Sequence, residues 1–149
     1  MIRVPGALAL IVSFIAAASA APAGTPCPSL KALTIPAVTI TSASALPAGP
    51  FSPPGSRSPM MLPAFCRIEG VARPVTDSEI KFEVWIPTPE AWNGKFQGVG
   101  NGTFTGEIQY GDLMSGIRGG YATISSDTGH KSDGDEQTNY TTALYLGGE

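Results

Sequence analysis

The fold class rests on residues 96–130, FQGVGNGTFTGEIQYGDLMSGIRGGYATISSDTGH. This stretch opens with a short apolar run, which is followed by the glycine-rich segment 100–106. Apolar side chains at helical spacing follow between Ile108 and Ile117, and a Gly-Gly pair then favours a helix end. A buried strand is predicted over 121–126. A strand, a helix and a strand in this order are typical of an α/β fold.

The chain before this unit carries mainly strand patterns. Residues 33–46 alternate apolar and hydroxyl side chains, and Pro36 favours an edge strand or a break. Period-two alternation predicts strands at 66–72 and 79–86, while the proline-rich stretch 49–59 predicts an extended connector. Within the second strand, one face holds Ile80, Phe82, Val84 and Ile86, and the other holds Lys81, Glu83 and Trp85. We therefore expect an α/β fold with a β-rich start, one strand–helix–strand unit and its remaining elements missing.

Composition excludes several classes of protein. The 149 residues include 18 Gly and 14 Pro, a load of helix breakers that a helical bundle or coiled coil could not absorb. The hydrophobic share of 42% is enough for a core. A net charge of −3 gives no support for a nucleic-acid partner, which clustered Lys and Arg would indicate.

The amino terminus has the features of a secretory signal. Arg3 precedes an apolar run over 7–18, and Ala18-Ser19-Ala20 supplies the small residues of a cleavage site. A membrane anchor is the alternative, although the run is short for a span of about 20 residues. We expect a secreted or periplasmic protein with no membrane contact after cleavage. The expected division is a signal peptide at 1–20, an Ala/Pro/Ser-rich segment with edge strands at 21–60, a partial α/β core at 61–130 and an atypical tail at 131–149.

Cys27 and Cys66 are the two cysteines of the chain. Export favours a disulfide between them, and two free thiols or a bond to another chain are the alternatives. A bridge would close a loop of 38 intervening residues. In the chain-entropy model, this loop closure would stabilise the folded chain by roughly 3–4 kcal/mol. Its role would be structural.

Residues for catalysis are few. The chain contains no Gly-x-Ser-x-Gly nucleophile elbow, and His130 is its single histidine. Two cysteines and one histidine are too few for a zinc site, so no metal is expected. His130 follows a predicted strand after Asp127, where it could serve a ligand site or merely hydrogen-bond a neighbouring loop while Asp127 caps the turn.

The glycine-rich segment is the more informative feature. A strand that opens into Gly100-Asn101-Gly102-Thr103 can direct successive N–H groups toward one point, as an oxyanion hole requires. The alternative is a tight turn without a ligand. Asn101 and Asn139 both begin glycosylation sequons. A rival function is a secreted, non-catalytic β-rich module that binds polysaccharide or a partner through Trp85 and Trp92.

Taken together, several blocks resemble the amino-terminal third of the tannase and feruloyl esterase family. They are Leu62–Arg67, Ile80–Pro87, Trp92–Phe96, Gly98–Gly102, Gly120–Thr123 and Asp127–His130. The resemblance implies a secreted α/β-hydrolase, a serine esterase that cleaves esters of phenolic acids such as gallate or ferulate. The partner it implies is a small aromatic or phenolic ester.

The resemblance also implies roles for individual residues. Cys27 and Cys66 match the family's amino-terminal disulfide. Gly102 and Thr103 match the oxyanion loop, where the family usually has Gly-Asn-Gly-Gly-Phe and Thr103 stands in place of a glycine. His130 is not the family's catalytic histidine.

Other family features have no counterpart in this sequence. It contains no match to the triad or to the lid domain, which often binds calcium, so no cofactor is expected within this chain. Residues 131–149 depart from the family pattern. The resemblance therefore implies a truncated chain that is inactive alone.

Overall fold

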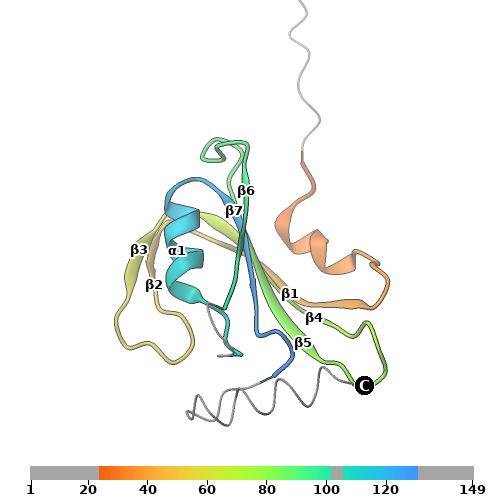
Figure 1. Ribbon diagram of the computed structural model, residues 1–149. Coiled ribbons are helices and arrows are strands. Elements are labelled where there is room, and N and C mark those ends of the chain that lie inside the picture. The colour runs from red at the N-terminus through yellow and green to blue at the C-terminus, as the bar shows by residue number, and fades with distance from the viewer. Residues whose placement is uncertain (1–23, 102–105, 131–149) are drawn as a thin grey trace, which may run out of the picture.

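The computed structural model describes residues 24–101 and 106–130 (Figure 1). Its helices are the 3₁₀ helix η1 (Cys27–Ala32) and the α-helix α1 (Tyr110–Arg118). Its strands are β1 (Val38–Leu46), β2 (Gly49–Phe51), β3 (Met60–Leu62), β4 (Phe65–Ala72), β5 (Ile80–Pro87), β6 (Phe96–Val99) and β7 (Ala122–Ser126). The predicted signal peptide and the tail 131–149 lie outside the described residues.

Five strands form one mixed sheet in the order β1-β4-β5-β7-β6. The pairs β1–β4, β4–β5 and β5–β7 are antiparallel, whereas β6 and β7 are parallel. The parallel pair is joined through α1, as parallel neighbours require a crossover connection. The expected β-rich start and strand–helix–strand unit are therefore confirmed.

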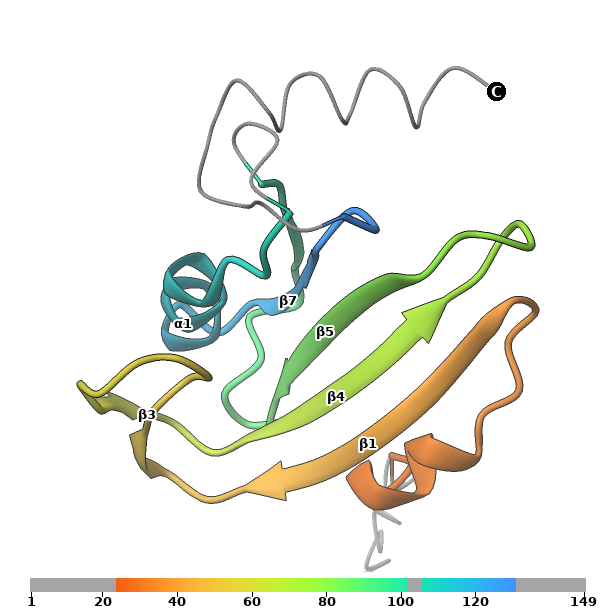
Figure 2. The ribbon, with the colours of Figure 1, turned by 90° about the horizontal axis from the view of Figure 1, so that it is seen from below.

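The helix α1 forms where the apolar spacing predicts it. Leu113, Met114 and Ile117 are buried, and the chain leaves the helix at Gly119. Asp112 in the first turn and Arg118 in the last complement the helix dipole. Figure 2 shows the helix beside the end of the sheet that carries β7, next to β3.

One prediction about the connector was wrong. Residues 49–59 were expected to be an extended connector, but Gly49–Phe51 forms β2 and pairs antiparallel with β3. The reason is Phe51, whose ring meets the rings of Phe65 and Trp85 at centroid distances of 5.8 and 5.2 Å, both edge-on. Aromatic packing against the core thus draws this proline-containing segment into a hairpin.

The core lies between the sheet and the layer formed by α1 and the β2–β3 hairpin. Its buried members are Leu62, Phe65, Trp85, Leu113, Met114 and Ile117. On β5 the covered face is the one that carries Glu83 and Trp85, whereas Phe82 and Val84 on the opposite face are half-buried. The more polar face of this strand is therefore the deeper one.

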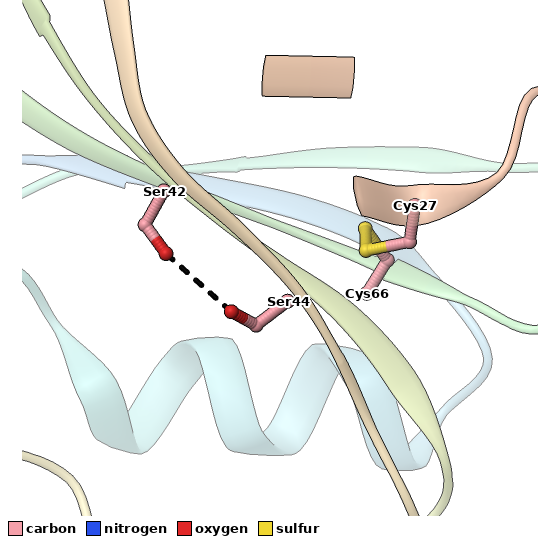
Figure 3. Close-up of a disulfide and its surroundings, with 4 residues drawn as sticks. All are labelled: Cys27, Ser42, Ser44 and Cys66. Carbon is pink, nitrogen blue, oxygen red and sulfur yellow. Dashed lines mark hydrogen bonds between the residues drawn. A yellow bond between two sulfur atoms is a disulfide. The ribbon is translucent and has the colours of Figure 1, made fainter. Parts of the chain in front are cut away.

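A disulfide joins Cys27 of η1 to Cys66 of β4, with 5.7 Å between their Cα atoms (Figure 3). This confirms the intramolecular pairing. Cys66 alternates with Phe65, which belongs to the core, so the bridge lies on the sheet face opposite α1. It fastens η1 to the half-buried face of the sheet.

Candidate functional site

The parallel strands β6 and β7 end side by side. Their last paired residues are Val99 and Ser125. Gly100 and Asn101 continue from β6, while Asp127 begins the segment that follows β7. Side chains and amides beyond the carboxyl ends of parallel strands commonly form the ligand sites of α/β proteins. This end of the sheet is therefore the candidate functional site.

The two segments are hydrogen-bonded to each other through side chains. The Asn101 amide nitrogen Nδ2 donates to the Thr128 hydroxyl Oγ1 at 3.2 Å. The same hydroxyl lies 3.0 Å from His130 Nδ1 and 2.7 Å from the carbonyl oxygen of Asp127, to which it donates. Thr128 thus connects the end of β6 to the turn that follows β7.

Asp127 shapes that turn. Its carboxylate oxygen Oδ1 accepts the backbone N–H of Gly129 at 2.9 Å and that of Lys81 at 2.8 Å. Its own N–H donates to the Lys81 carbonyl at 2.9 Å. Asp127 therefore acts as a turn cap that also ties the turn to β5, and its buried carboxylate is occupied by these donors.

Gly106, where the described chain resumes, lies against the turn that follows β7. Gly106 adopts a left-handed φ of 61°, and a Cβ there would collide with the carbonyl oxygen of His130. The Gln109 N–H then donates to Ser125 Oγ at 3.0 Å. Both described ends of the segment 102–105 consequently lie against the end of β7. Gly102 and Thr103, the predicted oxyanion donors, lie outside the described residues.

A buried ionic cluster lies beneath α1. The carboxylate of Glu83 is 2% exposed and accepts from four donors on three other residues. These are Arg67 Nε at 2.8 Å and Arg67 Nη2, Trp85 Nε1 at 2.8 Å and the Tyr110 hydroxyl at 2.7 Å. Because Tyr110 begins α1, this cluster joins the helix to β4 and β5.

Protonation in this cluster is set by its hydrogen bonds. Burial alone would raise the pKa of Glu83, but donation from Arg67, Tyr110 and Trp85 outweighs it and lowers that pKa. The hydrogen bond to Glu83 raises the pKa of Arg67 further. Burial, followed by the hydrogen bond to Glu83, raises the pKa of Tyr110. The cluster therefore holds an ionised Glu83–Arg67 pair and a neutral tyrosine.

Sequence reasoning placed Glu83 on a strand face and missed its partners. The signal was present, since Arg67 and Glu83 each occupy a strand face with period-two alternation. The register that brings them together, with Arg67 opposite Trp85 and Glu69 opposite Glu83, is a property of strand pairing. Alternation within one strand does not specify that pairing.

The two tryptophans differ in what they can bind. Trp85 is 0% exposed within the core, so it cannot stack on a ligand. Trp92 is 52% exposed, and its indole N–H donates to the Lys95 carbonyl at 3.0 Å across the Asn93-Gly94 turn. Of the two tryptophans that the rival binding function requires, only Trp92 is therefore accessible to a ligand.

Residues 24–101 and 106–130 do not fit a metal centre. Among them, no three His, Cys, Asp or Glu side chains are grouped so as to hold an ion. No helix in the described part of the chain is long and apolar enough to cross a membrane.

Solved structures of similar fold are esterases. Feruloyl esterase B from Aspergillus oryzae matches with a TM-score of 0.63 and 28% identity, covering 81% of this chain and 26% of that chain. An esterase from the same organism matches with a TM-score of 0.63 at 24% identity, covering 81% and 27%. The fold is thus the α/β type found in these ester hydrolases.

The family follows from the sequence comparisons. The family model described as tannase and feruloyl esterase matches residues 66–144, more than half of the chain, and the chain belongs to that family. The matched range ends inside the segment 131–149.

Two relatives show how much of a family member is present. An uncharacterized esterase of Xanthomonas campestris pv. campestris is 47% identical over 125 residues, which are 84% of this chain and 21% of the relative. Feruloyl esterase C of Talaromyces stipitatus is 32% identical over 82 residues, which are 55% of this chain and 15% of the relative. The chain therefore spans about a fifth of the length of the first relative.

Proposed function

We propose that this chain is the amino-terminal part of a secreted or periplasmic carboxylic ester hydrolase that cleaves esters of phenolic acids. The observation that carries the proposal is the parallel β6–α1–β7 unit, whose carboxyl ends bring Asn101 and the Asp127–His130 turn together. Family membership supports ester hydrolysis, and the names of the feruloyl esterase relatives support a phenolic acid as the acyl group. The Cys27–Cys66 disulfide supports an exported protein.

The proposed reaction is serine acyl transfer. A serine attacks the ester carbonyl, a histidine takes the serine proton, and the resulting tetrahedral intermediate carries a negative oxygen. We assign the stabilisation of that oxygen to the backbone N–H groups of Gly102 and Thr103. Each such donor typically contributes about 2.7–4 kcal/mol to the transition state. Since the amides donate, replacing the family's glycine by Thr103 preserves the chemistry.

The nucleophile is assigned to the part of the family fold that this sequence does not contain. The 149 residues hold no Gly-x-Ser-x-Gly motif. We therefore expect no hydrolysis of methyl ferulate or methyl gallate by purified residues 21–149 above a blank without enzyme. Hydrolysis above that blank would overturn this assignment. The acyl transfer needs no cofactor from this chain, and we assign the calcium site implied by the family to the lid domain.

The test of the proposed function is a hybrid esterase. Residues 24–130 of this chain would replace the matching region of the Xanthomonas relative, and both proteins would be assayed with methyl ferulate and methyl gallate. We expect the hybrid to retain the parent's hydrolysis. Thr103→Pro, which removes one N–H, should lower kcat about 10²–10³-fold. Thr103→Ala keeps that N–H and separates its effect from that of the side chain.

Two outcomes would contradict the proposal. One is a folded hybrid without activity on esters that the parent cleaves. The other is a Thr103→Pro hybrid that keeps its full kcat, because the amide at residue 103 would then donate to nothing in the transition state.

A further inference from the structure

The start of α1 is hydrogen-bonded to the sheet at two neighbouring residues. The Tyr110 hydroxyl donates to Glu83 Oε1 of β5 at 2.7 Å, and the Gln109 N–H donates to Ser125 Oγ of β7 at 3.0 Å. Glu83 and Ser125 lie opposite each other in the pairing of β5 with β7, and both are buried. The two acceptors therefore stand in one row across the sheet.

This row ends next to the candidate functional site. Ser125 pairs with Val99, the last residue of β6, and Asn101 lies two residues beyond Val99. Asp127 likewise lies two residues beyond Ser125. The start of α1 is thus attached to the last paired row of β6 and β7 before the contact between Asn101 and Thr128.

Apolar packing and hydrogen bonds constrain α1 in different ways. Leu113, Met114 and Ile117 are buried, and they determine which face of this nine-residue helix lies on the sheet. Apolar burial is non-directional, so it constrains the position of the helix along its axis less than a directional bond does. A hydrogen bond to an ionised acceptor is short and geometrically specific. The bond from Tyr110 to Glu83 is of this kind, so it determines where the helix begins.

The acceptor is itself held from the side of the sheet. Arg67 donates to Glu83 through Nε and Nη2, and Trp85 Nε1 donates to it at 2.8 Å. The rings of Tyr110 and Trp85 lie 6.4 Å apart, measured between their centroids. A carboxylate that accepts three bonds from β4 and β5 is poorly able to follow a displaced helix. Glu83 is therefore a fixed point for the Tyr110 hydroxyl.

We propose that Tyr110 and Ser125 are positioning residues for ester hydrolysis, whose hydroxyls fix the start of α1 relative to the carboxyl ends of β6 and β7. This inference rests on the proposed function, because those strand ends form the candidate functional site. In this role both residues act through the helix and the sheet, not through contact with the substrate. The buried charge of Glu83 thus serves the geometry of the site.

Tyr110→Phe tests the proposal, because it keeps the ring and removes only the hydroxyl. In the full chain we expect faster amide hydrogen exchange at Gln109 and at Leu113, whose N–H donates to the Gln109 carbonyl at 3.1 Å. Exchange at Gly120, whose N–H donates to the Ile117 carbonyl at the other end of the helix, should stay unchanged. A residue that merely stabilised the fold would speed exchange at both ends when replaced.

Ser125→Ala is the second variant, and it tests the same proposal if Tyr110→Phe does not fold. It removes the acceptor of the Gln109 N–H, and we expect faster exchange at Leu113 as well. A folded variant of either residue that exchanges at Leu113 like the unmodified chain would overturn the proposal.

The matched control is Tyr121→Phe, the same chemical change just beyond the other end of α1. The Tyr121 hydroxyl is not among the donors to Glu83. The control should therefore leave exchange at Gln109 and Leu113 unchanged. Faster exchange at these two amides in Tyr121→Phe would show that any lost tyrosine hydroxyl loosens the helix, and would overturn the specific role of Tyr110.

Activity in the hybrid esterase gives an independent readout. Tyr110→Phe and Ser125→Ala should each lower kcat about tenfold with KM changed by less than about twofold, because displaced groups lose contact in the transition state. Tyr121→Phe should keep both constants. An inactive hybrid whose variants show the expected exchange would refute the ester hydrolase alone. An active hybrid that keeps full kcat in Tyr110→Phe or Ser125→Ala would refute the positioning role alone.

Discussion

At the scale of single residues, Glu83 is an ionised carboxylate on the buried face of β5. Arg67 supplies two of its hydrogen bonds, and Trp85 and Tyr110 supply the others. Removing one partner of a buried pair leaves an uncompensated charge, which costs more than the pair itself contributes. The cluster is therefore sensitive to loss of the arginine.

Arg67→Leu should destabilise the chain by about 3–5 kcal/mol at neutral pH. The pH dependence should also change sign. In the unmodified chain the pKa of Glu83 lies below its ordinary value of 4.5, so its contribution is complete above that value and is lost as the pH falls through the lower one. Without Arg67, burial acts against fewer donors, so we expect the pKa of Glu83 to rise and acid to lessen the deficit. Urea unfolding between pH 3 and 7 gives the free energy of unfolding of the unmodified chain and of Arg67→Leu as a function of pH. The same pH dependence in both proteins would contradict the prediction.

Thr123 presents the opposite case, a buried hydroxyl that makes no hydrogen bond in the described part of the chain. Thr123→Val keeps the shape and removes the unpaired group, so it should raise the free energy of unfolding by about 1 kcal/mol. Thr41→Val, which removes a hydrogen-bonded hydroxyl, should not raise it. Urea unfolding of both variants is the measurement. A destabilised Thr123→Val chain would show that the hydroxyl is satisfied.

At the scale of elements, the β6–α1–β7 unit depends on how the chain enters and leaves its helix. Gly106 precedes α1 in a left-handed conformation against His130, while Gly111 within α1 has open space around it. Glycine is therefore required at the first position and costly at the second.

Gly106→Ala and Gly111→Ala should act in opposite directions. The first should destabilise the chain by about 1–3 kcal/mol through backbone strain and collision with the His130 carbonyl. The second should stabilise it by up to about 1 kcal/mol, since alanine is the better helix former. Thermal unfolding of the two variants checks this. Equal changes in stability for the two variants would mean that the backbone before α1 adapts to the added Cβ at no cost.

At the scale of the whole molecule, the sheet has an exposed edge. Within residues 24–101 and 106–130, β6 pairs with β7 alone, and its first residue, Phe96, is 63% exposed. The strand β7 exposes no edge, because it lies between β5 and β6. Unpaired edges are where sheets recruit further strands.

Phe96→Lys should therefore reduce concentration-dependent association of the chain. A lysine on an edge strand opposes edge-to-edge pairing and removes the exposed ring. Val75→Lys is the matched control, because Val75 is 62% exposed but lies in the connection between β4 and β5. Light scattering over a concentration series measures the monomer fraction. An equal gain from Val75→Lys would indicate general solubility rather than an effect of the edge.

Local pattern was enough to predict most elements of this protein. Alternation in 66–72 and 79–86, helical spacing before Gly119-Gly120 and a buried run at 121–126 correspond to β4, β5, α1 and β7. Each of these signals depends on neighbours in the chain, which the sequence displays directly. The family could likewise be identified from motifs in order along the chain.

Tertiary structure decided what depends on residues far apart in the chain. The covered face of β5 is the one with Glu83 and Trp85, because α1 and the β2–β3 hairpin lie on it and Arg67 neutralises the carboxylate. The hydroxyl of Thr128 reaches Asn101 because β6 and β7 are parallel and end together. Such contacts arise from strand register and crossover, which no local pattern encodes.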